Sequence, residues 1–261
     1  MIKEIKNPEI KFNIPKFICD NNSVGEHLLD HPLTSLLNVY GFLCVIGRPG
    51  SGKTSLTISL ITQKTPKIYR KTHHHVLILM PENSISSLKN NPFKILPEEN
   101  IYNELTDDSM MMIFNKIDGY SKNDEKTLLF IDDMTADLKK SKYIIDIFKK
   151  LVYNRRHLKL NIIITAQSYV NLPLDIRKNI QNLIMFKPPK KELEIVFNEL
   201  FESKKNIFLD IMKMVYDEKH NFLFLNVPNQ RMFKNWNELI IEDDSDEDGE
   251  IEKKEIKNIN I

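Results

Sequence analysis

Apolar residues along this chain fall into short runs, and amphipathic stretches lie between the runs. The runs predict buried strands at 42–46, 75–80, 126–131, 160–165 and 183–187. Runs this short and this continuous are typical of parallel strands that are covered on both faces. Between them, apolar residues recur at helical spacing over 55–61, 106–120 and 141–154. This alternation predicts an α/β fold with a mainly parallel central sheet and helices on both faces.

The inner faces of two helices can be assigned from the same spacing. In the helix 106–120 we expect Met111, Phe114 and Ile117 to face the core. The helix 141–154 has a longer apolar face, made of Ile144, Ile147, Phe148, Leu151 and Val152. Beyond Pro188-Pro189, we expect two helical stretches within about 190–217 and a hairpin from 222–227 and 231–236 to complete the fold.

A glycine-rich segment joins the first strand to the first helix. It reads Gly47-Arg-Pro-Gly-Ser-Gly-Lys-Thr54 and fits the pattern G-x-x-x-x-G-K-[ST] without a mismatch. Between a strand and a helix, such a loop binds phosphates through backbone N–H groups and the helix N-terminus. Lys53 should reach the β- and γ-phosphates, and the Thr54 hydroxyl should ligate Mg²⁺. We therefore expect ATP to be bound by Gly47, Arg48, Pro49, Gly50, Ser51, Gly52, Lys53, Thr54 and Ser55.

A second strand ends in paired carboxylates, Asp132 and Asp133, and has the form of a Walker B segment. Two acids at a strand tip repel each other unless a cation lies beside them, so the pair implies a metal. We expect Asp132 to hold Mg²⁺ and Asp133 to polarise the attacking water. Glutamate is the usual second acid in ATPases of this type, and the shorter Asp133 requires the water to lie slightly nearer.

A polar residue also follows the later strand 160–165: the next two residues are Ala166 and Gln167. In additional-strand (ASCE) P-loop NTPases, a strand lies between the P-loop strand and the Walker B strand, and a polar residue at its tip reaches the γ-phosphate. Gln167 stands where that sensor belongs, although a lone glutamine after a strand is also an ordinary loop residue. The helix before this strand ends in Arg155-Arg156-His157, where basic residues complement the helix dipole.

Together these segments resemble the FtsK–HerA superfamily of DNA-pumping ATPases, especially the DNA-packaging ATPases of poxviruses and giant viruses. The resemblance covers roughly residues 36–190 and rests on the two motifs above, on 154–167, and on 172–179 before the strand 183–187. In similar motors, the arginine finger lies eleven positions before the sensor glutamine, which corresponds to Arg156 here. Paired aspartates are also typical of the viral branch. Arg177 is a further arginine of the family pattern, and contact with DNA and packing both remain open as its role.

Charge is distributed unevenly along the chain. Residues 242–261 contain nine acidic residues and three lysines, a balance of −6. Because the whole chain of 261 residues carries +1, residues 1–241 carry +7, which suits a protein that binds a polyanion. We expect one P-loop domain over 1–241, made of an extension 1–35, a motif-bearing core 36–190 and C-terminal helices and hairpin 191–241. We expect 242–261 to be a disordered acidic tail.

Other features of the composition concern the compartment. No apolar run approaches the roughly 20 residues that a membrane span needs, and the N-terminal residues lack the pattern of a signal peptide. The two cysteines, Cys19 and Cys44, suggest a reducing compartment and provide no zinc framework. We expect an intracellular protein, in the host cytoplasm at the virus factory or associated with the virion.

The resemblance implies a Mg²⁺-dependent ATPase that translocates double-stranded DNA and packages a viral genome into a capsid. A homo-oligomeric ring, pentamer or hexamer, would let one protomer offer Lys53, Thr54, Asp132, Asp133 and Gln167 while its neighbour offers Arg156. Basic loops would hold the DNA backbone in the central channel, and capsid or portal components would be partners. Two alternatives remain open: a small-molecule kinase, and a nucleotide-dependent switch that moves no DNA.

Overall fold

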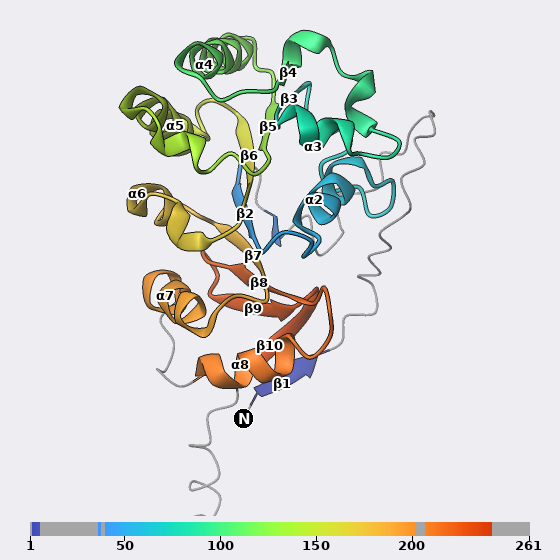
Figure 1. Cartoon of the computed structure of the whole chain (residues 1–261), viewed down its shortest axis with the longest axis vertical. Coiled ribbons are helices and arrows are strands. Elements are labelled where there is room, and N and C mark those ends of the chain that lie inside the picture. The colour runs from blue at the N-terminus through green and yellow to red at the C-terminus, as the bar shows by residue number, and fades with distance from the viewer. Residues whose placement is uncertain (1, 6–35, 38–39, 202–206, 242–261) are drawn as a thin grey trace, which may run out of the picture.

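The computed structural model describes residues 2–5, 36–37, 40–201 and 207–241. Most of the extension 1–35, Cys19 and the whole acidic segment 242–261 lie outside these ranges. In the described part, one ten-stranded sheet runs through the molecule in the order β1-β10-β9-β8-β7-β2-β6-β5-β3-β4 (Figure 1).

Six neighbouring strands of this sheet are parallel, and they carry the expected motifs. They are β2 (Phe42–Ile46), β3 (His75–Leu79), β4 (Ile101–Tyr102), β5 (Thr127–Ile131), β6 (Leu160–Ala166) and β7 (Asn182–Phe186). Every residue of β2, β5, β6 and β7 is buried, which explains why these strands read as continuous apolar runs rather than alternating ones. The predicted α/β fold with a mainly parallel central sheet is confirmed.

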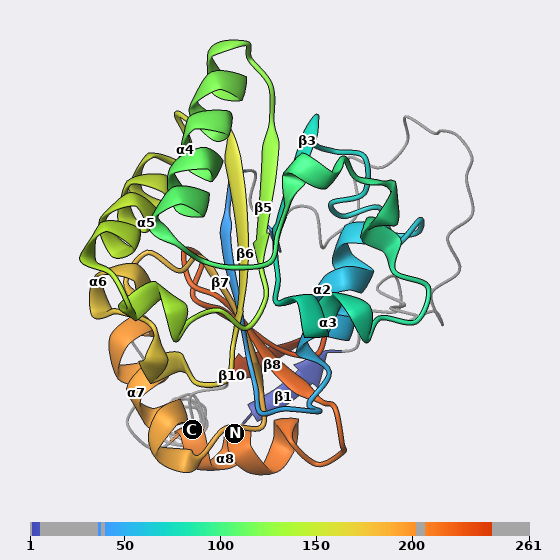
Figure 2. The same ribbon diagram turned by 45° about the horizontal axis from the view of Figure 1, so that its top comes forward.

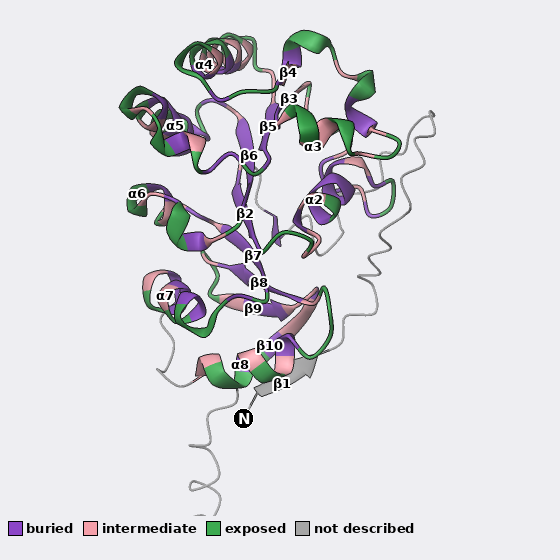
Figure 3. Cartoon of the chain, in the orientation of Figure 1, coloured by how far each residue is buried: buried purple, intermediate pink, exposed green. Residues whose placement is uncertain are grey.

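Helices cover both faces of the sheet (Figure 2). On one face lie α2 (Lys53–Thr62) and α3 (Glu82–Ser86), and on the other lie α4 (Asp107–Lys122), α5 (Lys142–Asn154), α6 (Leu174–Arg177) and α7 (Lys190–Leu200). Helix α8 (Ile207–Val215) packs against α7. Alternate residues of each strand enter two different cores, because side chains point to opposite faces: Phe42 and Cys44 face α5, whereas Leu43 and Val45 face α2. Buried positions accordingly concentrate in the strands, and exposed positions concentrate on the outer sides of the helices (Figure 3).

Helix α4 corrects one expectation about its inner face. Thr106 caps the helix in a reciprocal capping box with Ser109, and Met110, Ile113 and Ile117 are buried. Met111, which we expected to face inward, is 36% exposed. Ile117 is buried and Phe114 is partly buried against the same core, as expected, whereas Met110 takes the inner position that we assigned to Met111.

The remaining strands extend the sheet beyond β7 in antiparallel fashion. The expected hairpin is formed by β8 (Phe222–Asn226) and β9 (Arg231–Lys234), and β10 (Asn237–Ile241) follows. Strand β1 (Ile2–Ile5) then pairs with β10, so the two ends of the described chain meet at this edge. Aromatic side chains hold the hairpin to the α2 face: Phe222 and Phe224 each contact Trp236 edge-on, at centroid distances of 5.2 and 5.4 Å.

Short 3₁₀ helices occupy the loops that follow the strands. They are η1 (Pro92–Ile95), η2 (Glu98–Asn100), η3 (Asp137–Lys139) and η4 (Tyr169–Asn171). Within the described ranges, no helix is both long and apolar enough to cross a bilayer.

Candidate nucleotide-binding site

The glycine-rich loop between β2 and α2 wraps tightly against two neighbouring elements. Gly52 has φ +105°, in the left-handed region that only glycine adopts without strain, and it is the N-cap of α2. Gly47 lies so close to β7 that a Cβ on it would come within 2.9 Å of Phe186 Cβ. The loop is also tied to β6, because Gly47 N donates to Ala166 O at 3.1 Å. The loop is therefore preformed, with the N-terminus of α2 at its end.

Lys53 and Thr54 are the first two residues of α2 and follow the loop directly. Lys53 is only 7% exposed, and its Nζ donates to Arg48 O at 3.3 Å. Burial lowers the pKa of Lys53, whereas the negative charges of Asp133 and Asp132 act in the opposite direction. Those two carboxylates therefore support the ammonium form of the lysine.

Asp132 follows β5 directly and is 2% exposed. Thr54 Oγ1 donates to its carboxylate, at 3.1 Å from Oδ1, and Thr165 Oγ1 donates to the same Oδ1 at 2.7 Å. Burial raises the pKa of Asp132, and the two threonine hydrogen bonds oppose this rise. The hydroxyl of Thr54 and the carboxylate of Asp132 provide oxygen ligands of the type that Mg²⁺ prefers, together with phosphate and water oxygens. These residues fit a Mg²⁺ site. The described residues hold no group of three or more His, Cys, Asp or Glu side chains that would indicate another metal site.

Asp133 and Gln167 meet at the exposed side of the same cluster. Gln167 Nε2 donates to Asp133 Oδ2 at 3.0 Å, and both residues are exposed to solvent. Asp133 has φ +54°, an uncommon value for a residue other than glycine. Its backbone N–H donates to Thr165 Oγ1 at 2.9 Å, which holds the turn after β5 in place. The strained backbone thus directs the Asp133 carboxylate towards the residue expected to sense the γ-phosphate.

Thr165 is a residue of the site that the sequence analysis did not assign. It is fully buried near the end of β6, and its hydroxyl contacts both members of the acid pair, donating to Asp132 and accepting from Asp133 N. The available signal was a hydroxyl in the otherwise apolar stretch Ile162-Ile-Ile-Thr165, two positions before Gln167.

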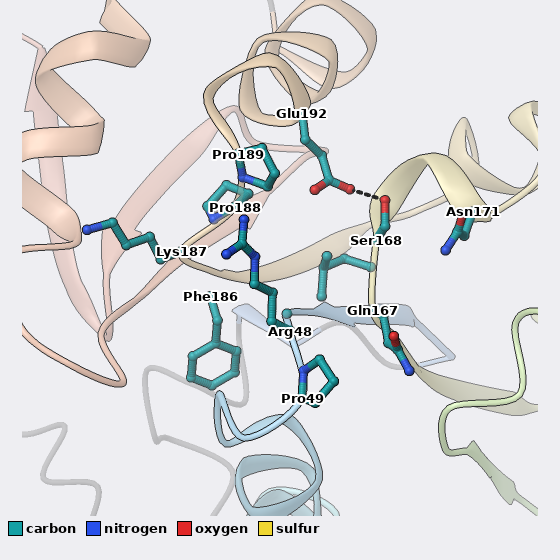
Figure 4. Close-up of a pocket in the computed structure, with 12 residues that line it drawn as sticks. Arg48, Pro49, Gln167, Ser168, Asn171, Phe186, Lys187, Pro188, Pro189 and Glu192 are labelled. Carbon is teal, nitrogen blue, oxygen red and sulfur yellow. Dashed lines mark hydrogen bonds between the residues drawn. The ribbon is translucent and has the colours of Figure 1, made fainter.

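The strand order brings these side chains together. Because β6 lies between β2 and β5, Gln167 lies between the phosphate-binding loop and the acid pair. This is the additional-strand arrangement that the sequence predicts. A hollow opens beside it, lined by Arg48, Gln167, Ser168, Phe186, the segment 187–189 and Glu192 (Figure 4). Arg48 extends from the loop towards Pro188 and Pro189, and Glu192 contacts Ser168 from the start of α7.

Arg156 lies elsewhere in the fold. It lies two residues after the end of α5 and four residues before β6, at the amino ends of the parallel strands. The seven residues of β6 separate that edge from Gln167 by roughly 20 Å, at about 3.3 Å per residue. Arg156 is exposed, whereas Arg155 is buried and donates from Nη1 to Val152 O at 2.7 Å. Arg177 pairs with Glu199 at 3.1 Å and lies over the ring of Tyr169, so its guanidinium has packing contacts within this protomer.

The phosphate-binding loop, the acid pair and the intervening strand define this chain as an additional-strand P-loop NTPase. Its sequence matches the profile of the Poxvirus A32 protein family over residues 31–260, and the chain belongs to this family. The family match confirms the resemblance to poxvirus packaging ATPases that the motifs indicated. A comparison with curated proteins gave no match.

Solved structures with a similar fold include two archaeal virus proteins. One is the genome packaging NTPase B204 of Sulfolobus turreted icosahedral virus 2 in complex with AMP, with a TM-score of 0.56 and 20% identity. The match covers 76% of this chain and 98% of that one. The other is B204, the DNA-packaging ATPase of Sulfolobus turreted icosahedral virus, with a TM-score of 0.57, 18% identity, and 75% and 96% of the two chains covered. At these identities the likeness shows the fold.

Proposed function

We propose that this protein is a Mg²⁺-dependent ATPase that translocates double-stranded DNA and packages a viral genome. The observation that carries the proposal is the cluster of Lys53, Thr54, Asp132, Asp133 and Gln167 around one phosphate-binding loop. Membership of the Poxvirus A32 family supports it. So do the similar folds of genome packaging NTPases, one of them solved with ATP-γ-S, with a TM-score of 0.55, 17% identity, and 75% and 96% of the two chains covered.

Within this proposal, the loop 47–55 binds the phosphates and Lys53 neutralises part of their charge. Thr54 Oγ1 and Asp132 would hold Mg²⁺, which when bound would neutralise charge that develops on the phosphate oxygens. Asp133 orients the attacking water and accepts its proton, because its carboxylate is exposed and contacts Gln167, the residue expected to meet the γ-phosphate. Gln167 releases its hydrogen bond with Asp133 and donates to the γ-phosphate instead.

The nucleoside would lie on the opposite side of the loop. The acid pair is on the β5–β6 side, so the phosphate chain points there and the base extends over β7 and β8. A hollow is present on that side, lined by Arg48, Pro49, Phe186, Lys187, Pro188, Lys219 and His220. His220 Nδ1 donates to Ser51 O at 2.9 Å and so links this hollow to the loop.

A ring would complete the site. Arg156 is exposed at the edge of the sheet opposite to the protomer's own loop, so it reaches a nucleotide only in a neighbouring protomer. An arginine finger in trans implies a homo-oligomer, and the proposal leaves a pentamer and a hexamer both open. Capsid or portal components would dock such a ring in the infected cell, at the virus factory or on the virion.

Double-stranded DNA is the substrate that the charge distribution favours. Residues 1–241 carry +7, and exposed lysines on these residues would contact the backbone without reading the bases. The binding constant would then fall with salt, with a slope of about −0.9 in log K against log salt for each neutralised phosphate of B-DNA.

The test measures the ATPase rate with and without duplex DNA over a range of salt, together with the mass of the assembly in solution. A packaging motor should form a ring, and duplex DNA of any sequence should stimulate it at low salt. Phosphorylation of a small-molecule acceptor would instead identify a kinase. Slow hydrolysis that duplex DNA does not stimulate would identify a switch.

A further inference from the structure

A buried carboxylate fixes the loop that follows Gln167. Glu192 lies in the first turn of α7 and is only 8% exposed. Its Oε1 accepts a hydrogen bond from Ser168 Oγ at 2.6 Å and a second one from the backbone N–H of Tyr169. These two donors are the residues directly after Gln167. Figure 4 shows the Glu192 carboxylate hydrogen-bonded to Ser168, and both residues line the hollow that Arg48 and Gln167 also line.

The same loop is joined to α7 at a second point. Tyr169 Oη donates to Glu199 Oε2 at 2.8 Å, and Glu199 Oε1 pairs with Arg177 at 3.1 Å. The guanidinium of Arg177 lies 4.9 Å from the centre of the Tyr169 ring. Tyr169 itself is fully buried, so its backbone and its side chain are both held by acids of one helix.

The backbone is therefore held in place both before and after Gln167. Before it, Ala166 O accepts from Gly47 N, which connects the end of β6 to the phosphate-binding loop. After it, Ser168 and Tyr169 are held by Glu192. The side chain of Gln167 is exposed and has few restraints of its own, so its reach depends on where these backbone neighbours lie.

We propose that Glu192 is a positioning residue, which holds Gln167 where its amide meets the γ-phosphate and which couples this sensor to α7. The inference rests on the proposed ATPase function. Glu192 acts as a hydrogen-bond acceptor, because both of its contacts are donors to one carboxylate oxygen. The N-terminus of α7 favours a negative charge at this position, but the positioning requires the acceptor rather than the charge.

The test compares steady-state ATP hydrolysis by the full-length wild type with that of three variants. Glu192→Ala removes the acceptor, Glu192→Gln keeps a carbonyl oxygen in its place, and Ser168→Ala removes one donor. Glu194→Ala is the matched control, because Glu194 is exposed on the same helix. Misplacement of a catalytic group by about 1 Å costs about 100-fold in rate, so kcat of Glu192→Ala should fall roughly 10- to 100-fold. The KM for ATP should change much less, because the loop 47–55 is intact.

The positioning role makes further predictions that a role in folding alone does not make. Glu192→Gln should recover most of kcat, because it keeps the acceptor. Ser168→Ala should lose kcat several-fold, about what one hydrogen bond provides, and the Glu194→Ala control should match the wild type. Should Glu192→Ala prove too unstable to assay, the Ser168→Ala and Glu192→Gln measurements still decide the question. An unchanged kcat in Glu192→Ala or Ser168→Ala, or a Glu192→Gln enzyme as slow as Glu192→Ala, would overturn the inference.

A binding measurement separates this inference from the proposed function. The wild type should bind ATP-γ-S more tightly than ADP, since Gln167 contacts only the γ-phosphate. Glu192→Ala should lose the part of that preference that Gln167 provides, while Lys53 keeps the rest and the affinity for ADP stays the same. A wild type that hydrolyses no ATP would contradict the proposed function. A preference for ATP-γ-S that is absent from the wild type or unchanged in Glu192→Ala would contradict the positioning role, whether or not ATP is hydrolysed.

Discussion

Burial disfavours the charged forms of both Lys53 and Asp132, which lie on neighbouring elements of the site. It lowers the pKa of the lysine and raises that of the aspartate. Each charge favours the other, and the hydrogen bonds from Thr54 and Thr165 also support the ionised Asp132. The site therefore holds a buried cation, Lys53, and a buried anion, Asp132, before any ligand binds. This is electrostatic preorganisation for a highly charged ligand.

Binding and hydrolysis should separate at Lys53 and Asp133. Lys53→Ala should abolish turnover and weaken ATP binding, because the phosphates lose a buried cation. Asp133→Asn should keep its ATP affinity, since Asp132 and the loop are intact, while kcat falls at least about 100-fold, the contribution of a general base. Nucleotide titration and steady-state kinetics measure the two effects, and the exposed Asp146→Asn on α5 is the control. Near-normal hydrolysis by Asp133→Asn would contradict its assignment as the base.

Asp132 should make the nucleotide-free protein less stable than an asparagine variant at neutral pH. The pKa of Asp132 is raised in the folded state above its ordinary value near 3.8. The protonated carboxyl therefore contributes its full stability to the fold below pH 3.8, and this contribution is lost as pH rises through the pKa of the folded state. Asp132→Asn removes this loss and keeps an acceptor for Thr165. We expect Tm without nucleotide to rise by about 2–4 °C at pH 7, for a gain of about 1 kcal/mol.

Thermal unfolding at two pH values tests this expectation. The gap between Asp132→Asn and the wild type should narrow towards pH 4, where the carboxyl of the wild type is protonated more fully. Mg²⁺-dependent hydrolysis should be lost in the variant. A variant that is less stable than the wild type at pH 7 would mean that the hydrogen bonds to the carboxylate outweigh its desolvation.

Local motifs predicted part of this site well. The loop 47–55 and the pair Asp132–Asp133 were found because each lies within one continuous segment of sequence. Thr165 was missed because its importance arises from contacts with β5, more than thirty residues away. Glu192 was missed for the same reason, since an acid near a helix N-terminus normally only complements the dipole.

At the scale of elements, the apolar runs predicted the central strands, and the site residues at their ends predicted the strand order. Gln167, shortly after the predicted strand 160–165, indicated that this strand lies between the loop strand and the Walker B strand, and β6 does lie between β2 and β5. Strands β1 and β10 were not predicted. Strand β1 has only four residues and pairs with β10 across more than two hundred positions, so it has no local signal. Strand β10 has five residues and directly follows the hairpin, where it pairs with β9. On the inner face of α4 only Met111 was misassigned, because the run of three methionines does not distinguish Met110 from Met111.

The end of α5 should act on a neighbouring protomer. Arg156→Ala should lower kcat by about 10³–10⁵, the contribution of an arginine finger, with little effect on Tm because the side chain is exposed. Mixing it with Lys53→Ala should restore some activity, since mixed rings contain interfaces with an intact loop and an intact finger. The exposed His157→Ala should behave as the wild type. No recovery at any mixing ratio, with mixed assemblies confirmed by mass, would assign Arg156 to a role within its own protomer.

At the scale of the whole molecule, charge is divided between two parts of the chain. Residues 1–241 carry +7 and residues 242–261 carry −6. Opposite charges on one chain attract each other at low salt, so the acidic segment could compete with DNA for the basic surface. An acidic segment that only keeps the protein in solution is the alternative.

Deletion of residues 242–261 distinguishes these two roles. If the segment competes with DNA, the shortened protein should bind duplex more tightly at low salt, and the difference should shrink as salt rises, because the Debye length falls from about 30 Å at 0.01 M to about 8 Å at 0.15 M. ATP affinity should be unchanged, since every residue assigned to nucleotide binding lies between 47 and 221. A full-length chain in which Glu242, Asp243, Asp244, Asp246, Glu247 and Asp248 are replaced by Ser is the matched control for length. It should behave like the deletion, whereas equal DNA affinity of all three proteins at low salt would leave the segment without a part in DNA binding.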